Sequence, residues 1–388
     1  MDIFHQDLIQ LEEEGLYRQL RTISAQKGPR VTVDGKELLV MASNDYLGFC
    51  YHPALQQAAQ KALNTWGAGS GSSRLISGNT AIFRDLEKKI AQLKGTEDAL
   101  VFSTGYMANM GLLTAVAEKD DVIYSDALNH ASIIDGCRLS RAQVEIFPHR
   151  DTDALETLLK KRKQFRRRFI KTDGVFSMDG DLAPLPRLTE LATAYSAQLI
   201  VDDAHGTGVL GSRGGGTAQH FGLEGKIAII MGTMGKALGC FGAFVAGSSE
   251  LREYLINRAR TFIFTTALPP AVIASALAAI ELIAKEPQKR QALWDNASFF
   301  RKGLQDIGFN ILESTTQIIP VFVGDSHMAM RLSNDLMEEG LFIQAIRPPT
   351  VPEGAARLRI TVMATHSKKD LTRALEILEK AGKRHKII

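Results

Sequence analysis

Between about Glu97 and Gly247, short runs of β-forming residues alternate with helical patterns, and no repeat or low-complexity stretch interrupts this order. Strands that alternate with helices are typical of parallel βαβ units. The predicted strands are the runs DALVFS, DVIYSD, AQVEIFP, RRFIKTD, AQLIVDD, KIAIIMG and GAFVAG. This part of the chain is therefore predicted to be an α/β domain with one large, mostly parallel seven-stranded sheet covered by helices on both faces.

The regions on either side of this domain have different patterns. The N-terminus begins with an amphipathic helical pattern, and two long helical stretches follow Pro269 and Pro270 before further strand and helix patterns. We expect an N-terminal helical segment and arm over residues 1–45, the large domain over 46–270, and a smaller α+β domain over 271–388. A chain of 388 residues suits this division at roughly 100 to 200 residues per domain.

Composition excludes several classes of protein. With 45% hydrophobic and 23% charged residues, the chain is typical of a folded globular protein. The longest apolar helical run, Ala271 to Ala284, is shorter than the ~20 residues of a membrane span and contains Glu281. The N-terminus lacks the features of a signal peptide, so a cytoplasmic protein is expected. The three cysteines are far apart, without metal-ligand spacing, and predict neither disulfides nor a metal site.

One basic cluster, KKRKQFRRR from Lys160 to Arg168, stands out against a net charge of +3. It follows the helical pattern DALETLL, and cations are favourable at the C-terminal end of a helix. We therefore interpret it as a solvated surface and expect no nucleic-acid binding.

Polar residues follow five of the predicted strands. Ligands of open α/β sheets bind beyond the carboxyl ends of the strands, so residues at these ends are candidates for one site. The candidates, in chain order, are Thr104, Gly105 and Tyr106; Asn129 and His130; Ser177; Asp202 and His205; and Thr233 and Lys236.

This set meets the requirements of a pyridoxal 5'-phosphate (PLP) site, which needs a Schiff-base lysine, a carboxylate for the pyridine nitrogen, phosphate donors and a face for the ring. Lys236, in the glycine-flanked GTMGKALG, is poorly explained as a surface charge. Asp202 ends an apolar strand and would keep the pyridine nitrogen protonated. Gly105 precedes a helical pattern whose N–H groups could receive the phosphate, and Thr233 could add a hydroxyl. Taken singly, Thr-Gly-Tyr also suits a plain strand-to-helix turn.

A competing motif fails in its context. Gly206, Gly208 and Gly211 in HGTGVLG satisfy the G-x-G-x-x-G pattern of a dinucleotide site. The following SRGGGTAQHFG has no apolar helical stripe, and no strand about 20 positions later ends in an acidic residue. Dinucleotide binding is not expected.

Six stretches occur together and in order: SNDYLG (43–48), GSGSSRLISG (69–78), LNHASIIDG (128–136), DGVFSMDGDLAPL (173–185), VDDAHGTGVLG (201–211) and IRPPTVPEGAARLRIT (346–361). With them, nearly the whole chain resembles the α-oxoamine synthases. This resemblance implies the PLP-dependent transferase fold of the aspartate-aminotransferase type. It also implies an acyltransferase that condenses an amino acid with an acyl thioester and releases carbon dioxide.

Within that family, IRPPTVPEG followed by RLRIT, together with VFSMDGD, is most similar to the members that join L-alanine to a pimeloyl thioester in biotin biosynthesis. The resemblance implies that Lys236 is the Schiff-base lysine and that Asp202 pairs with the pyridinium. It also implies that His130 stacks on the ring and meets the substrate, and that Ser177 and His205 contact the cofactor near its phenolic oxygen.

The remaining positions follow from the same resemblance. Gly105, Tyr106 and Thr233 match phosphate-side positions. Thr265 and Thr266 match hydroxyls that reach the phosphate of a partner subunit, which implies a homodimer with shared sites. On the substrate side, Arg359 matches the arginine that binds the amino-acid carboxylate, and Arg18, Asn44 and Thr350 match other substrate contacts. Cys240 and Phe241 depart from the family pattern, as does Tyr106, where phenylalanine is frequent.

Alternatives to this interpretation remain. The nearest is a glycine C-acetyltransferase, a member of the same family that uses glycine and acetyl-CoA. A second is a non-catalytic binding subunit with this fold, against which Lys236, Asp202 and Arg359 speak together. A third treats Lys160 to Arg168 as a docking patch for an acidic acyl-carrier protein or for nucleic acid. The acyl donor itself is expected on coenzyme A or on such a carrier protein.

Overall fold

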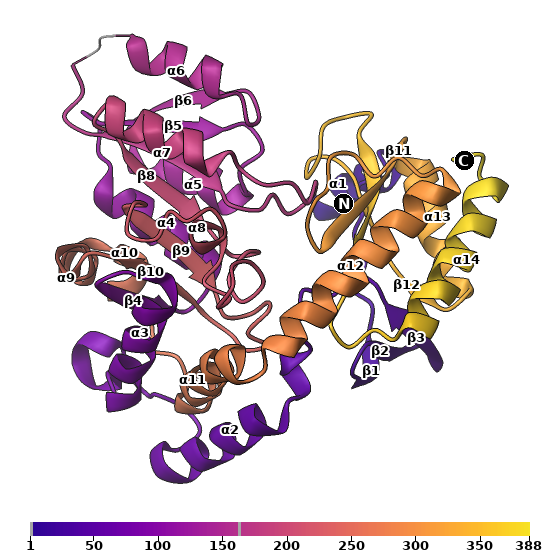
Figure 1. Ribbon diagram of the computed structural model, residues 1–388, viewed down its shortest axis with the longest axis horizontal. Coiled ribbons are helices and arrows are strands. Elements are labelled where there is room, and N and C mark those ends of the chain that lie inside the picture. The colour runs from indigo at the N-terminus through magenta and orange to yellow at the C-terminus, as the bar shows by residue number, and fades with distance from the viewer. Residues whose placement is uncertain (1–2, 162–163) are drawn as a thin grey trace. The chain divides into compact units, whose positions relative to one another are not determined.

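The computed structural model describes residues 3–161 and 164–388 (Figure 1). The chain divides into two compact units. The larger unit contains residues 49–177 and 182–290. The smaller unit contains the N-terminal residues up to Gly48, residues 178–181 and residues 291–388.

A seven-stranded sheet forms the centre of the larger unit, in the order β4-β10-β9-β8-β7-β5-β6. Only β10 runs against its neighbours β4 and β9, and the other strands are parallel to one another. Six of these strands lie within the predicted runs and β9 extends one residue past its run KIAIIMG, so the predicted mostly parallel α/β sheet is confirmed. The strands are β4 (Asp98–Phe102), β5 (Val122–Asp126), β6 (Gln143–Phe147), β7 (Arg168–Asp173), β8 (Gln198–Asp202), β9 (Ile229–Thr233) and β10 (Ala243–Gly247).

Helices cover both faces of this sheet (Figure 1). Side chains alternate between the faces along a strand, so Ile200 of β8 packs in one hydrophobic cluster and Val201 in the other. The first cluster includes residues of α4 (Gly105–Val116), α5 (Ala131–Ser140), α9 (Ser249–Arg258) and α10 (Arg260–Ile263). The second includes residues of α6 (Thr152–Lys160), α7 (Leu185–Ala194) and α8 (Thr217–His220).

Three further helices of the larger unit pack together: α2 (Pro53–Trp66), α3 (Ala81–Lys94) and α11 (Pro270–Lys285). Local chemistry sets their ends. Pro53 occupies the first turn of α2, where its missing N–H costs no hydrogen bond, and α3 ends at Gly95 in the left-handed conformation. A short 3-10 turn (Phe49–Tyr51) and a π-helical turn (Arg74–Gly78) complete the unit.

The smaller unit contains two small sheets. One has the order β1-β2-β3-β12 and the other β11-β14-β13. Its helices are α1 (Ile3–Glu13), α13 (Ser326–Glu338), α14 (Lys368–Arg384) and most of α12 (Pro287–Ile307). Its strands are β1 (Ile23–Lys27), β2 (Arg30–Val33), β3 (Lys36–Val40), β11 (Ile318–Gly324), β12 (Leu341–Phe342), β13 (Gln344–Ile346) and β14 (Ala356–Thr361).

The observed division differs from the expected regions 1–45, 46–270 and 271–388. The N-terminal segment belongs to the same unit as the C-terminal region, because β3 pairs in parallel with β12 some 300 residues later in the chain. Helix α11, expected in the last region, packs against α2 and α3 in the larger unit. No helix in the described part of the chain is both long and apolar enough to span a membrane.

Candidate active site

The carboxyl ends of the parallel strands in the larger unit carry many of the predicted site residues. Strand β8 ends at Asp202 and β9 ends at Thr233, while His205 and Lys236 lie in the turns that follow. Because these strands are parallel neighbours, their carboxyl ends lie at one edge of the sheet. The structure therefore gathers these residues at the edge where α/β sheets bind ligands.

Asp202 is buried, with 5% of its surface exposed. Its Oδ2 accepts a hydrogen bond from Asn109 Nδ2 at 2.7 Å, and its Oδ1 accepts one from the backbone N–H of Ala204 at 3.0 Å. Burial by itself would raise the pKa of this carboxyl, but the charges of Lys171 and Lys236 and these two donors bring it below its ordinary value. Asp202 is thus a buried carboxylate held in its ionised form.

The second feature is a lysine–histidine contact. Lys236 is half-buried in the turn between β9 and β10, and its Nζ lies 2.9 Å from Nε2 of the buried His205. The contact joins two turns that follow neighbouring strands, β8 and β9. An amine and an imidazole at this separation can pass a proton between them.

His130 caps the N-terminus of α5, and two contacts fix its position. Its Nδ1 accepts from the backbone N–H of Ser132 at 3.2 Å, and its own backbone N–H donates to Asp173 Oδ2 at 3.0 Å. The His130 side chain is exposed, yet the surrounding protein removes enough water to lower the pKa of the imidazole, against the opposing charge of Asp202. His130 therefore offers a neutral ring at the edge of the larger unit.

The N-terminus of α4 provides a site for an anion. Thr104 caps this helix by accepting from the backbone N–H of Met107 at 3.1 Å, which leaves the N–H groups of Gly105 and Tyr106 without partners inside the helix. A Cβ on Gly105 would lie 2.8 Å from Cγ2 of Thr233, so only glycine fits there without a shift. The Thr233 hydroxyl is buried and has no hydrogen-bond partner among the described residues. These groups suit a phosphate.

The other predicted positions in the larger unit are Ser177, Thr265, Thr266 and Tyr106. Ser177 is half-buried in the turn after β7. Thr265 is half-buried and Thr266 is exposed in the segment after α10, where Thr266 forms a β-bridge with Ser73. Tyr106 is exposed and donates a hydrogen bond from its hydroxyl to Asp135 of α5, and this contact raises the pKa of the phenol.

Four predicted residues belong to the smaller unit. Arg359 of β14 is buried, and its Nη2 donates to Asn44 Oδ1 at 3.1 Å. Arg18 and Thr350 line one cavity of about 570 Å³ together with Arg21 and Arg347. The structure thus brings the predicted substrate residues of this unit together in two pairs.

Several residues of these sites were not predicted. Asn109, in the middle of α4, and Lys171, in the middle of β7, are fully buried near Asp202, whereas the cofactor residues predicted from the strand pattern all follow strand ends. Arg21 and Arg347 join the cavity of the smaller unit. Arg347 lies in the IRPPT motif beside Thr350, so this motif was the available signal.

The residues present fit the predicted cofactor. A buried ionised carboxylate can hold a protonated pyridine nitrogen, a half-buried amine can hold the aldehyde carbon, and the unpartnered Thr233 hydroxyl with the first N–H groups of α4 can hold the phosphate. Among the described residues, no group of three or more His, Cys, Asp or Glu side chains is arranged to hold a metal ion.

Comparison with known proteins agrees with this geometry. The sequence profile of the aminotransferase class I and II family matches residues 36–378. An 8-amino-7-oxononanoate synthase from Geobacter sulfurreducens is 52% identical over 379 residues, which cover 97% of each chain.

Two solved structures are also similar. A serine palmitoyltransferase from S. paucimobilis with a bound PLP-myriocin aldimine has a TM-score of 0.95 and 31% identity, over 100% of this chain and 98% of that one. An 8-amino-7-oxononanoate synthase from Francisella tularensis has a TM-score of 0.79 and 30% identity, over 90% of this chain and 99% of that one. With its profile match, its close relatives and its mostly parallel sheet, the chain belongs to the aminotransferase class I and II family.

Proposed function

We propose that this chain is a PLP-dependent acyltransferase that condenses L-alanine with a pimeloyl thioester. The products are 8-amino-7-oxononanoate, carbon dioxide and the free thiol, in the biotin pathway of the cytoplasm. The observation that carries the proposal is the contact of Lys236 Nζ with His205 Nε2, at 2.9 Å, on the sheet edge that ends in Asp202. The 52% identity to a relative named 8-amino-7-oxononanoate synthase supports the choice of substrates.

When bound, PLP supplies a conjugated ring that delocalises the electron pair left at the Cα of an amino acid. In this proposal Asp202 accepts a hydrogen bond from the ring nitrogen and His130 covers the ring face. Ser177 and His205 contact the ring oxygen, and the start of α4 with Thr233 holds the phosphate. Lys236 first holds the cofactor and then, as a free amine, takes the Cα proton and later returns one, with His205 adjusting its basicity.

The amino-acid substrate would be held by Arg359. A planar guanidinium matches a carboxylate in a bidentate geometry, and Asn44 fixes the Arg359 side chain by accepting from its Nη2 at 3.1 Å. Asn44 Oδ1 also accepts from the Tyr46 hydroxyl at 3.1 Å, so three side chains of the smaller unit orient one another. This arrangement supports a fixed carboxylate-binding arginine.

The acyl chain would bind at the cavity of about 570 Å³ that Arg18, Arg21, Arg347 and Thr350 line. A pimeloyl thioester ends in a carboxylate or its ester. The three guanidinium groups of this cavity can donate hydrogen bonds to the oxygens of that end group. Burial and the nearby charge of Arg18 lower the pKa of Arg347, so an anion placed there would relieve this repulsion.

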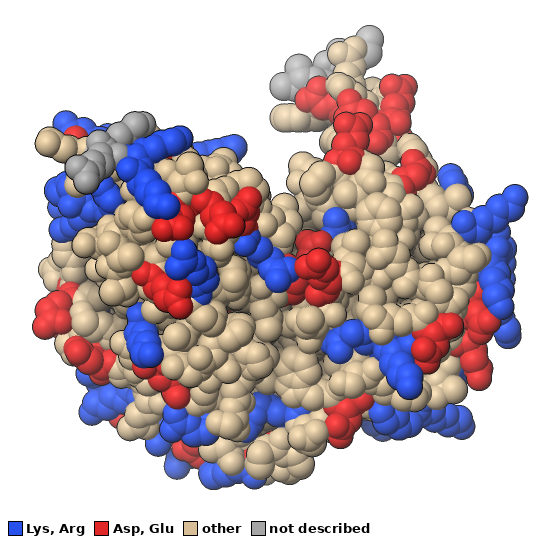
Figure 2. Space-filling view, turned by 45° about the horizontal axis from the view of Figure 1, so that its top comes forward, with Lys and Arg blue, Asp and Glu red and all other residues tan. Residues whose placement is uncertain are grey.

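The basic cluster Lys160 to Arg168 is a poorer candidate for receiving an acyl-carrier protein. Part of it, residues 162 and 163, lies outside the described residues. Arg168 begins β7, whereas Asp173 ends it, so the cluster lies at the edge of the sheet opposite Asp202. Figure 2 shows Lys and Arg side chains gathered at the upper left of the view, on the larger unit. Arg166 is paired with Asp121 at 2.7 Å, as expected for a structural surface charge.

A homodimer with shared sites is part of the proposal. Several apolar side chains of the larger unit are exposed, and four of them lie close in sequence to Ser73, Lys236 and Thr265. These four are Leu75 (49%), Ile76 (82%), Phe241 (53%) and Phe264 (71%). Phe264 immediately precedes Thr265 and Thr266, the two residues expected to reach the phosphate of a partner subunit. A second copy that covers these side chains would bring the two hydroxyls to a subunit boundary.

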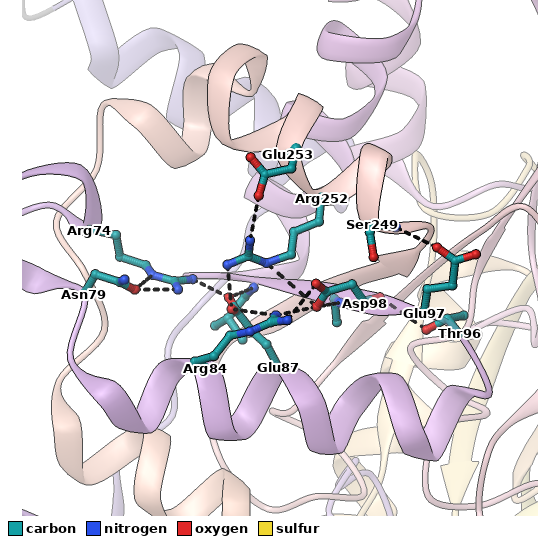
Figure 3. Close-up of polar contacts among 12 residues, drawn as sticks. Arg74, Asn79, Arg84, Glu87, Thr96, Glu97, Asp98, Ser249, Arg252 and Glu253 are labelled. Carbon is teal, nitrogen blue, oxygen red and sulfur yellow. Dashed lines mark hydrogen bonds and ion pairs between the residues drawn. The ribbon is translucent and has the colours of Figure 1, made fainter.

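A buried ion network anchors this region (Figure 3). Arg74 begins the turn that presents Ile76, and its Nη1 lies 2.5 Å from Oε1 of the fully buried Glu87. Arg252 approaches the other oxygen of Glu87 at 3.3 Å. The Ser73–Thr266 bridge then ties the segment after α10 to the same turn. The segment that we propose faces a partner is thus held by buried charges.

The test is the visible spectrum of the purified protein with PLP, recorded before and after addition of L-alanine and, separately, glycine. We expect an absorbance band of the lysine-bound cofactor that responds selectively to L-alanine. A response mainly to glycine would favour a glycine C-acetyltransferase instead. The absence of any bound-cofactor band would overturn the proposed PLP chemistry.

A further inference from the structure

Three ionisable side chains are buried together at the carboxyl edge of the large sheet. Lys171 and Asp173 of β7 are 0% and 5% exposed, and Asp202 of β8 is 5% exposed. Residues two apart on a strand face the same side, so Lys171 and Asp173 share a face. Asp173 is paired in register with Asp202 on the parallel neighbour β8, and adjacent strands lie roughly 4.8 Å apart. One ammonium and two carboxyls therefore share one buried cluster.

The partners of these groups are unequal. Asp202 accepts from Asn109 and Ala204, and Asp173 accepts from the backbone N–H of His130. In contrast, the Lys171 Nζ is buried without a hydrogen-bond partner among the described residues. A fully buried lysine is rare unless its charge is compensated. Its neighbours on the same face of the sheet, Phe169 and Ile200, are apolar, so packing alone would accept an apolar side chain here.

The other ionisable groups around the cluster add little charge. Burial raises the pKa of the Cys137 thiol to about 11, so this thiol stays neutral. Desolvation lowers the pKa of His130, which favours the neutral imidazole. The charge of Lys236 also lowers the pKa of Asp202. In the proposed function, however, this amine bonds to the cofactor and is no longer a free ammonium.

The charges of the cluster then match those of a bound pyridine ring. With both carboxyls ionised, Lys171 offsets one of the two negative charges, and one remains. A protonated ring nitrogen carries one positive charge, so the buried set is neutral when the ring nitrogen pairs with Asp202. If Lys171 alone is neutralised, one negative charge is left in excess unless a carboxyl binds a proton. If Asp173 alone is neutralised, one positive charge is left in excess.

We propose that, once PLP is bound, Lys171 and Asp173 form a self-neutralising pair that leaves Asp202 as the single net negative charge for the ring nitrogen. Lys171 is in this sense a positioning residue that acts through Asp202 and does not touch the reacting atoms. The inference rests on the proposed PLP function and deepens it. It explains why a lysine occupies a strand interior where its Nζ has no hydrogen-bond partner among the described residues.

The test is a charge-deletion cycle on PLP binding by the apoprotein. Lys171→Met, Asp173→Asn and the double variant are titrated with PLP, beside the wild type. The Asp173→Asn side chain keeps an oxygen that can accept from the His130 N–H. Asp173→Asn leaves the Lys171 charge uncompensated beside the ring nitrogen, so we expect the affinity to fall by about tenfold or more. The double variant removes both charges and should return to within about threefold of the wild type.

A second readout follows the proton itself. Burial and the neighbouring Asp202 raise the pKa of Asp173, so Asp173 should hold a proton before the cofactor binds and lose it afterwards. In Lys171→Met there is no ammonium to balance an ionised Asp173, so Asp173 should keep its proton when PLP binds. Calorimetry in buffers of different ionisation enthalpy should therefore show that the wild type releases about one proton more than Lys171→Met on binding PLP. This comparison does not require Asp173→Asn to fold.

Ile170→Met is the matched control, because Ile170 is buried on the opposite face of β7. It should leave both the PLP affinity and the proton count unchanged. Additive losses in the double variant, or equal proton release by the wild type and Lys171→Met, would overturn the charge-balance proposal. Failure of the wild type to bind PLP would overturn the proposed function instead, so the two failures are distinguishable.

Discussion

The side-chain amide of Asn109 bridges two parts of the larger unit by donating to Asp202 Oδ2 at 2.7 Å and to Ser132 Oγ at 2.9 Å. Ser132 Oγ lies 2.8 Å from Nδ1 of His130. One chain of hydrogen bonds therefore joins the carboxylate proposed for the ring nitrogen to the imidazole proposed for the ring face. Helix α4 supplies the central residue of this chain and also the helix start proposed for the phosphate.

Asn109→Leu should weaken PLP binding by about tenfold, since a hydrogen bond to a charged group contributes roughly 1.5 to 3 kcal/mol. Loss of this donor raises the pKa of Asp202. As the pH is lowered, the carboxylate of the variant is therefore protonated at a higher pH than that of the wild type, and PLP affinity should fall at that higher pH. Titration of the apoprotein across a pH series measures this effect. Ser132→Ala, which leaves the bond from Asn109 to Asp202 in place, should lose much less affinity. Equal losses in both variants would contradict the assigned role.

Lys236→Ala should lower turnover by roughly a thousandfold or more, the scale expected when a member of a catalytic unit is removed. The cofactor band should change at the same time, because the amine that holds the aldehyde carbon is gone. Turnover with L-alanine and a pimeloyl thioester, recorded with the absorption spectrum, measures both. Lys226→Ala removes an exposed lysine shortly before β9 and should behave as the wild type. Wild-type turnover by Lys236→Ala would refute the lysine assignment.

Gly105→Ala should weaken PLP binding by about tenfold, or ~1.4 kcal/mol, through a steric effect. The added Cβ would lie 2.8 Å from Thr233 Cγ2, and the branched Thr233 side chain has few other rotamers. The Thr233 hydroxyl would then move away from the phosphate. Gly69→Ala, at a glycine with no atom within 4 Å of the added Cβ, is the control for a glycine substitution. Unchanged affinity in Gly105→Ala would show that no phosphate lies between these residues.

His366 should make the smaller unit sensitive to acid. Burial lowers the pKa of this imidazole to about 4 from the ordinary 6.5. The unfolded chain therefore binds a proton between these values that the folded chain does not, so stability is full above pH 6.5 and falls as the pH drops towards 4. The loss amounts to roughly 3 kcal/mol at about 1.4 kcal/mol per pKa unit.

Urea unfolding of the wild type and of His366→Gln over this pH range measures the contribution of His366. The variant should be less stable at neutral pH, because the Gln amide holds its acceptor and donor at positions different from the Nδ1 that accepts from Met363 N–H and the Nε2 that donates to the Val40 carbonyl. Its stability should change less with pH than that of the wild type. His220→Gln, at an exposed position, should keep the wild-type slope. A wild-type slope in His366→Gln would assign the acid sensitivity to other groups.

Lys94→Met should destabilise the larger unit by about 3 to 5 kcal/mol, because it leaves a buried charge uncompensated. Lys94 is 1% exposed, and its Nζ lies 2.6 Å from Asp203 Oδ2 and 2.7 Å from Thr207 Oγ1. Lys94→Met combined with Asp203→Asn should cost less than the sum of the single variants. Thermal and urea unfolding measure these differences. Lys88→Met, at an exposed position of the same helix, should change stability by less than about 0.5 kcal/mol.

Local sequence patterns were sufficient for the larger unit and for much of its site. The alternation of strands and helices predicted all seven strands of the sheet, and parallel order alone implied that residues such as Asp202, Thr233 and Lys236 meet at one edge. These predictions succeed because hydrophobic periodicity reports which backbone geometry can bury a segment, and parallel strands end on the same side.

Only the tertiary structure decided which residues away from strand ends join the site. Asn109 lies inside a helix and Lys171 inside a strand, where a polar residue gives no local signal of its partner. The N-terminal strands likewise find their sheet partner, β12, far away in the chain. Such contacts depend on how whole elements pack, and packing brings together residues that no local period relates. The sequence by itself therefore determined the main sheet and its reactive edge, and the packing of helices and strands determined the buried charges behind that edge.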